Sequence, residues 1–112
     1  MKQIINSEKA PAPIGPYSQA VKANNTLYVS GQIPIDQTAG TLVESGIEDE
    51  TEQVMQNLQH ILKAAGLSFT NVVKCSIFIS DMKYFQKING IYGKYFDDAP
   101  PARETVATDA SE

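Results

Sequence analysis

One arginine stands apart from the other charged residues of this chain. Arg103 is the only arginine among 112 residues, and lysines supply the rest of the positive charge. It directly follows Pro100-Pro101-Ala102, and the fixed backbone angle of proline restricts the segment that carries it. A guanidinium offers a planar pair of donors that matches a carboxylate, which the ammonium group of lysine cannot do. Arg103 is therefore a candidate carboxylate-binding residue, with an ordinary surface ion pair as the alternative.

Other groups that commonly carry chemistry are sparse. His60 is the only histidine and Cys75 the only cysteine, whereas a zinc site needs several converging ligands. We expect His60 on the solvated flank of a helix and Cys75 as a buried, inert thiol on an apolar strand face. Neither a Ser-His-acid set nor a glycine-rich phosphate loop or dinucleotide motif is present in the sequence.

Length and charge narrow the class of protein. The 112 residues suit one domain, and 42% hydrophobic residues are typical of an ordinary soluble globular protein. A net charge of −4 without a basic stripe makes nucleic acid a poor partner. Because no apolar run has the length of a signal peptide or a membrane span, we expect a cytoplasmic protein that binds no membrane.

The first half of the chain predicts a hairpin and a helix. Two short strands are expected after a proline-rich loop, joined by a turn at Asn24-Asn25, because asparagine tolerates left-handed backbone angles. An S-x-x-E capping box at Ser45 and Glu48 predicts the start of a helix, and Gly66 its end.

The second half predicts a strand, a helix and a final strand. The stretch "NVVKCSIFIS" at 71–80 alternates as a strand does. Asp81 is placed to cap a helix that must end before Pro100-Pro101. The order of elements predicts an α+β domain, with two helices on one face of a mixed sheet.

The opposite face of that sheet has a mixed composition. It is too mixed for a core and too aromatic for full exposure, which favours an oligomer interface that retains water or a ligand. Its members are Tyr28, Ser30, Val72, Lys74, Ser76 and Phe78.

Five blocks of sequence carry a family resemblance. In order, they read "APIGPYSQA", "LYVSGQIPID", "QNLQHILKAAGLSFTNVVKCSIFISDM", "FQKINGIYGKYF" and "PPARETV". Together they resemble the reactive-intermediate deaminase (Rid) family, RidA subgroup, from about Ile4 to Val106. The resemblance implies a chorismate-mutase-like fold and a homotrimer with ligand sites between subunits.

The same resemblance implies an activity. Family members hydrolyse 2-imino acids, such as 2-iminobutanoate and 2-iminopropanoate, to 2-oxo acids and ammonia, with neither a metal nor an organic cofactor. Those imines escape from pyridoxal-phosphate-dependent dehydratases, which implies a functional link to such enzymes. A non-catalytic small-carboxylate binding or regulatory module is the alternative.

Site residues are also implied by position in the matched blocks. Arg103 would bind the substrate carboxylate, assisted by the backbone N–H of Gly31. Tyr17 would line the pocket with its hydroxyl near the imine. The polar wall would be completed by Ser30 and Asn89, and the backbone carbonyl of Thr105 would orient water.

The sequence departs from the family pattern at its end. Family members continue past "PARETV" into a last strand with a glutamate thought to orient the hydrolytic water, whereas this sequence reads "ATDASE". Neither Glu104 nor Glu112 lies in the matching motif. We therefore expect a single Rid-type domain over residues 1–112, truncated after about residue 106 relative to the family.

Overall fold

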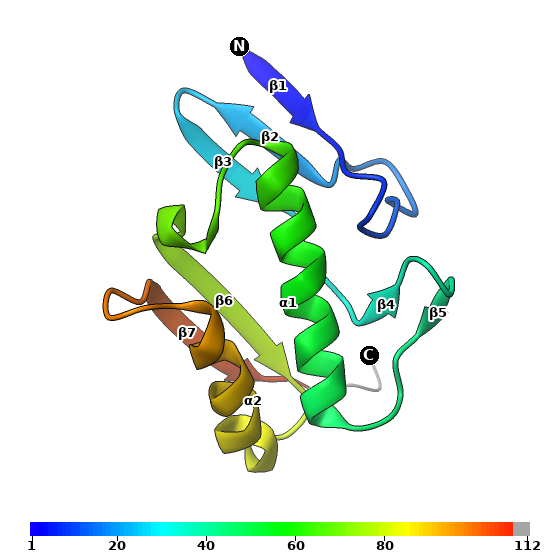
Figure 1. Ribbon diagram of the computed structural model, residues 1–112, viewed down its shortest axis with the longest axis vertical. Coiled ribbons are helices and arrows are strands. Elements are labelled where there is room, and N and C mark those ends of the chain that lie inside the picture. Colours follow the sequence, from blue (N-terminus) through cyan, green and yellow to red (C-terminus); the bar gives the residue numbers. More distant parts are fainter. Residues whose placement is uncertain (109–112) are drawn as a thin grey trace.

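The computed structural model describes residues 1–108. It contains seven strands, two α-helices and three short 3₁₀ turns (Figure 1). The strands and α-helices are β1 (Lys2–Ile5), β2 (Ala20–Ala23), β3 (Thr26–Val29), β4 (Ile35–Asp36), β5 (Thr41–Leu42), α1 (Ile47–Ala64), β6 (Lys74–Ile79), α2 (Phe85–Tyr92) and β7 (Ala102–Ala107). The 3₁₀ turns are η1 (Phe69–Asn71), η2 (Met82–Tyr84) and η3 (Gly93–Tyr95). Residues 109–112, which include Glu112, lie outside the described part.

The N-terminal strands form the predicted hairpin and one more antiparallel neighbour. Strands β2 and β3 pair across the turn, and β1 pairs with the other edge of β2. Asn24 and Asn25 have φ angles of 56° and 79°, the left-handed values that a tight hairpin turn requires. The turn predicted from this asparagine pair is confirmed.

Helix α1 ends as predicted but begins differently. Gly66, with φ of 75°, follows the C-cap residue Ala65, and a left-handed glycine at this position is a common helix end. At the other end Gly46 is the N-cap residue, and no side chain caps the helix. The predicted capping box of Ser45 and Glu48 is therefore wrong. Ser45 Oγ instead donates to Oδ2 of Asp49 at 2.7 Å, one helical turn further along.

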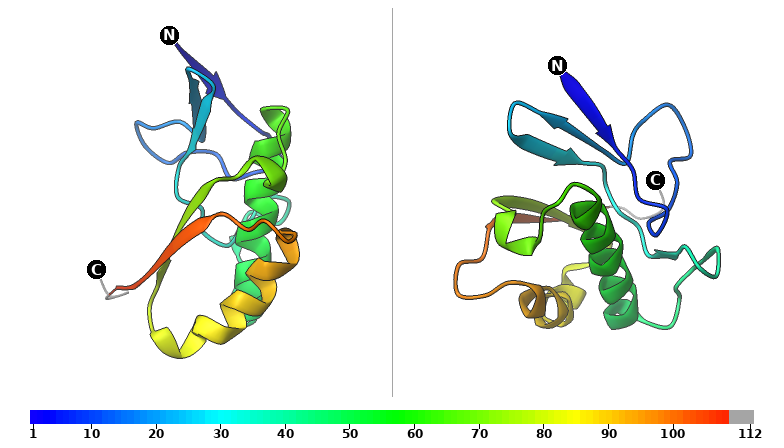
Figure 2. Two further views of the ribbon diagram at one scale, coloured as in Figure 1. Left: turned by 90° about the vertical axis from the view of Figure 1, so that its left-hand side faces the viewer. Right: turned by 45° about the horizontal axis from the view of Figure 1, so that its top comes forward.

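Strands β6 and β7 form a parallel pair beside both helices. Their register joins Cys75 to Arg103 and Ile77 to Thr105. Both α-helices lie on one side of this pair (Figures 1 and 2). The chain enters α2 through η2. Asp81 caps η2, since its Oδ1 accepts a hydrogen bond from the N–H of Lys83 at 2.9 Å, whereas the N-cap residue of α2 itself is Tyr84, without a side-chain cap.

The α+β class with two helices is confirmed, but the described strands do not form one continuous sheet. Hydrogen bonding divides them into β1-β2-β3, β4-β5 and β6-β7. Within residues 1–108, β3 and β6 each pair along one edge only. The loss of the family's last strand and its glutamate stays a prediction. No helix of the described residues is long and apolar enough to cross a membrane.

Two buried polar side chains connect the parts of the fold. Asn57 on α1 is 0% exposed, and its Nδ2 donates to the carbonyl oxygens of Ile33 and Ile35 at 3.1 and 3.0 Å. Gln19 is also buried and donates to the carbonyl oxygens of Ala10 and Pro11. Gln19 thus satisfies carbonyl groups of the irregular segment before β2, and Asn57 connects the segment around β4 to α1. The loops around the pocket described below are therefore fixed.

Candidate functional site

Arg103 lies on the face of β7 that is turned toward α2. Side chains alternate along both strands of the β6-β7 pair. Cys75 and Ile77 on β6, and Arg103 and Thr105 on β7, are half-buried, whereas Glu104 between them is exposed. The strand register thus places the arginine on the inner face of the pair, away from open solvent.

Three residues of α2 surround the guanidinium of Arg103. Its Nη1 donates to Oδ1 of Asn89 at 2.6 Å. Its Cζ lies 5.4 Å from the ring centroid of Phe85 and 5.0 Å from that of Tyr92. These three positions are spaced by four and three residues, so they share one face of the helix. An arginine positioned over aromatic rings gains about 0.5–1 kcal/mol for each contact at an exposed site, and more where water is excluded.

The same guanidinium has no acidic partner among residues 1–108. The ion pair found there joins Lys74 to Glu104 instead, and these two residues lie on the outer face of the strands. A half-buried positive charge without a counterion is unfavourable, because desolvation is not offset by a negative charge. The arrangement is therefore suited to binding an anion from outside this part of the chain.

Tyr92 is the most buried of the groups that contact Arg103. It is 8% exposed, and its hydroxyl has no hydrogen-bond partner among the described residues. Burial raises the pKa of Tyr92 above its ordinary value, the adjacent Cys75 adds to the shift, and the positive charge of Arg103 opposes it. Tyr92 therefore stays neutral beside the guanidinium at physiological pH.

The remaining predicted residues line a small cavity. Tyr17, Ser30 and Gly31 border a pocket of about 50 Å³ that is also lined by Ile14 and Gln19. Ser30 Oγ donates to the carbonyl oxygen of Ser18 at 2.6 Å. The hydroxyl of Tyr17 accepts a hydrogen bond from the N–H of Ile14 at 3.3 Å.

Gly31 follows the end of β3 and is exposed. Its backbone N–H takes part in none of the hydrogen bonds found within residues 1–108. It is therefore free to donate to a ligand.

The six predicted site residues thus fall into two groups within one chain. Arg103 and Asn89 are in direct contact, with Thr105 on the same face two residues along β7. Tyr17, Ser30 and Gly31 share the pocket, and Arg103 is not among the residues that line it.

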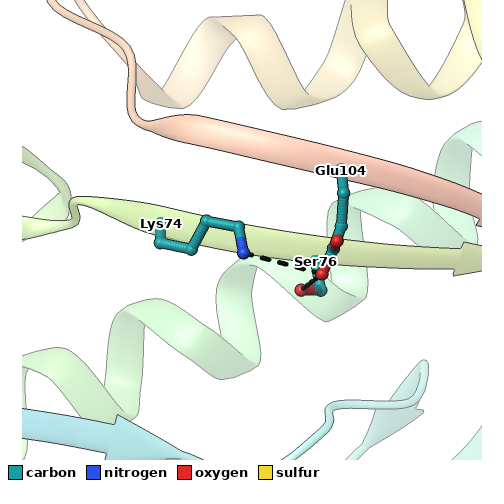
Figure 3. Close-up of polar contacts among 3 residues, drawn as sticks. All are labelled: Lys74, Ser76 and Glu104. Carbon is teal, nitrogen blue, oxygen red and sulfur yellow. Dashed lines mark hydrogen bonds and ion pairs between the residues drawn. The ribbon is translucent and has the colours of Figure 1, made fainter.

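The outer face of the strands is mixed in polarity, as expected. Oε1 of Glu104 accepts a hydrogen bond from Ser76 Oγ at 2.6 Å and lies 3.6 Å from Nζ of Lys74 (Figure 3). The hydrogen bond from Ser76, followed by the charge of Lys74, lowers the pKa of Glu104 below its ordinary value. Phe78 on β6 and Tyr28 on β3 are 67% and 63% exposed.

His60 and Cys75 are both half-buried. The expectations of a solvated histidine and of a fully buried thiol are therefore both corrected. Within residues 1–108, no group of three or more His, Cys, Asp or Glu side chains is placed to hold a metal ion.

Phe85 and Tyr92 are the members of the Arg103 environment that the sequence did not identify as site residues. Their spacing in the sequence is that of an apolar helix face, which by itself indicates a core contact and not a ligand site. Asn89 lies in the same stripe, between Phe85 and Tyr92. An amide interrupting an apolar stripe was the available signal that this face contacts a polar group.

The fold and the sequence together define the class of protein. The sequence model of the family described as Endoribonuclease L-PSP matches residues 7–111. The chain belongs to this family, which includes the Rid proteins.

Individual relatives agree with this assignment. The chain is 48% identical over 103 residues to the 2-iminobutanoate/2-iminopropanoate deaminase of Mus musculus, covering 92% of this chain and 76% of that protein. A crystal structure of a protein of the conserved Rid family from Yersinia pestis has a TM-score of 0.95 and 44% identity, covering 98% of this chain and 88% of the other. The crystal structure of E. coli TdcF with bound serine has a TM-score of 0.90 and 34% identity, covering 96% and 86%. Several relatives of similar identity carry only the family name RutC.

Proposed function

We propose that this protein hydrolyses reactive 2-imino acids, such as 2-iminobutanoate and 2-iminopropanoate, to 2-oxo acids and ammonia. The observation that carries the proposal is the half-buried guanidinium of Arg103, which contacts only neutral side chains of α2 and no acid among residues 1–108. Such a group binds a small carboxylate well. The mammalian relative named as a deaminase supports the reaction, and the relative with bound serine supports a ligand that carries an α-carboxylate.

The chemistry requires few groups. A protonated imine is already electrophilic, so a water molecule adds to its carbon, and the C–N bond of the resulting carbinolamine breaks with proton transfer to nitrogen. One imino acid and one water give one 2-oxo acid and one ammonia, without oxidation or reduction. The protein must hold the substrate by its carboxylate, orient the water and assist proton transfer.

Each predicted residue has a role in this proposal. Arg103 binds the carboxylate, and the free N–H of Gly31 donates to the same group. Tyr17 lies near the imine, Ser30 forms part of the polar wall, and the carbonyl of Thr105 orients water. Asn89 also fixes Arg103, because its Oδ1 already accepts from Nη1.

Assembly of the site requires more than one subunit in this proposal. The Arg103 group and the Tyr17 group are separate within one chain, so we place the reaction in a cleft where the two groups of neighbouring subunits meet. The exposed Tyr28 and Phe78 on the mixed outer face form part of the subunit contact of a homotrimer. Analytical ultracentrifugation tests the assembly: a purely monomeric protein at micromolar concentration would contradict it.

The activity is tested by a coupled assay with Arg103→Lys. A pyridoxal-phosphate-dependent threonine dehydratase generates 2-iminobutanoate, and the release of ammonia is followed with and without the protein. We expect the native protein to accelerate release and Arg103→Lys to lose most of the acceleration, because lysine keeps the charge without the two-donor geometry. Lys87→Arg is the matched control, since it exchanges the same two cationic side chains at an exposed position of α2 outside the proposed site. Full activity of Arg103→Lys would overturn the proposal.

The same experiment separates the alternative functions. Binding of 2-oxobutanoate without acceleration would identify a small-carboxylate binding module instead. The family description also names a ribonuclease, which is tested by adding RNA, although the net charge of −4 disfavours an RNA substrate. In the proposed function the protein acts in the cytoplasm, beside the dehydratases that release 2-imino acids.

A further inference from the structure

Helix α2 presents one neutral face to Arg103. Phe85, Asn89 and Tyr92 each contact the guanidinium, and the distances are 5.4 Å and 5.0 Å from Cζ to the two ring centroids and 2.6 Å for the hydrogen bond to Asn89. None of these side chains carries a negative charge. The guanidinium is therefore held in place without being neutralised.

Orientation matters because a guanidinium must present two donors in one plane to bind a carboxylate. The hydrogen bond to Asn89 fixes a single nitrogen, and one bond leaves rotation about its axis open. Contacts with the two aromatic rings restrict the plane of the group as well. The rings thus supply the part of the orientation that the amide does not.

We infer that Phe85 and Tyr92 are positioning residues, which set the plane of the Arg103 guanidinium for recognition of a planar carboxylate. The inference rests on the proposed role of Arg103 as the carboxylate-binding residue. Both rings act through Arg103 and neither has to touch the substrate.

For Tyr92, the ring and the hydroxyl can be separated by substitution. The hydroxyl has no partner in hydrogen-bond geometry among residues 1–108, and the nearby thiol of Cys75 is only a weak donor and acceptor, so removal of the hydroxyl leaves no strongly polar group unpaired. Tyr92→Phe keeps the ring beside Arg103, whereas Tyr92→Leu removes it. Phe85→Leu provides the equivalent loss at a half-buried position, where a cavity is less damaging than at the buried Tyr92.

The orientation of Arg103 can be measured directly by NMR. Because Arg103 is the only arginine, the Nε–H region of a uniformly ¹⁵N-labelled sample contains a single arginine signal. We expect this signal to be displaced from the free-arginine position by the ring currents and protected from exchange with water. Phe85→Leu and Tyr92→Leu should move it toward the free position and speed its exchange, whereas Tyr92→Phe should leave it nearly unchanged. If neither the chemical shift nor the exchange rate of this signal changes when a ring is removed, the inference is wrong.

Binding and kinetics provide the second measurement. The affinity for 2-oxobutanoate is determined by calorimetry, and KM and kcat by the coupled assay. Each leucine variant should bind about threefold or more weakly, with the loss mainly in KM, and Tyr92→Phe should restore native affinity. Thermal melts identify any variant that fails to fold, and Phe85→Leu then carries the test alone.

Failure of this inference differs from failure of the proposed function. If the leucine variants release the Arg103 signal but the native protein neither binds 2-oxobutanoate nor releases ammonia faster, the proposed function is wrong and the positioning of Arg103 stands. If the native protein is active and the leucine variants keep native KM and affinity, the positioning role is wrong.

Discussion

Arg103 Nη1 donates a hydrogen bond to Oδ1 of Asn89 at 2.6 Å, and this contact connects β7 to α2. The acceptor is an amide oxygen and not a carboxylate, although both would accept the bond. A carboxylate at this position would neutralise the guanidinium, whereas a neutral amide does not. An amide fixes the guanidinium and leaves its charge available.

Asn89→Asp should therefore weaken carboxylate binding while keeping the fold. The aspartate has nearly the same shape and accepts the same hydrogen bond, but it forms an ion pair with Arg103 that competes with the substrate carboxylate. We expect kcat/KM to fall about tenfold or more and the thermal stability to be equal or higher. Steady-state assays and thermal melts measure both quantities.

Lys87→Gln is the control for the change in net charge, since it also lowers the charge by one unit and lies on the same helix. An Asn89→Asp protein with native kcat/KM would show that the charge of Arg103 is not used for binding.

Gly31→Ala tests whether Gly31 is needed for activity and not for stability of the fold. A Cβ at Gly31 would meet no atom within 4 Å in its own chain. Because the substitution also restricts the unfolded chain, we expect unchanged or slightly higher stability, by about 0.5 kcal/mol. Activity should nevertheless fall, since the proposed ligand or the neighbouring subunit approaches the backbone at this position. Chemical denaturation and the coupled assay together test this, and native activity would remove Gly31 from the site.

Ser76→Ala should raise the pKa of Glu104 toward its ordinary value. The hydrogen bond from Ser76 is the main cause of the lowered pKa, and the charge of Lys74 adds to it. A lowered pKa means that the ionised carboxylate is favoured in the folded state. Its contribution to stability is present above the pKa of the unfolded chain and is lost as the pH falls through the folded-state pKa.

NMR titration of the Glu104 side-chain carboxyl measures this pKa in the native protein and in Ser76→Ala. Lys74→Met should give a smaller shift in the same direction. An unchanged pKa in Ser76→Ala would show that the hydrogen bond in Figure 3 does not persist in solution.

Asn57→Leu should destabilise the fold strongly. The side chain is 0% exposed and donates to the carbonyl oxygens of Ile33 and Ile35. Leucine would remove both of these buried hydrogen bonds, although the carbonyl of Ile33 would still accept from the N–H of Ile35. We expect the free energy of unfolding to fall by about 2–4 kcal/mol. Gln56→Ala, at an exposed position of the same helix, is the control and should change stability little. Urea denaturation measures both, and similar midpoints for the two variants would contradict the role of Asn57.

Local features of this fold could be predicted from sequence because their causes are local. The Asn24-Asn25 turn and Gly66 at the end of α1 depend on backbone angles that these residues adopt easily. The capping box failed for a related reason. The backbone of Gly46, with φ of 133°, allows the helix to begin one residue after Ser45, so that Ser45 bonds to Asp49 instead.

Sequence by itself was enough to make Arg103 the candidate carboxylate-binding residue, since the type of side chain and its rarity are properties of the chain alone. Only the tertiary structure decided what surrounds it. Phe85, Asn89 and Tyr92 meet the guanidinium because β7 pairs in parallel with β6 beside α2, a contact between segments that are separated along the chain. Likewise, Asn57 is buried and bonded to Ile33 and Ile35 only because the segment around β4 packs against α1. Spacing along a chain predicts which residues share a face, but the partner of that face depends on the packing of distant elements.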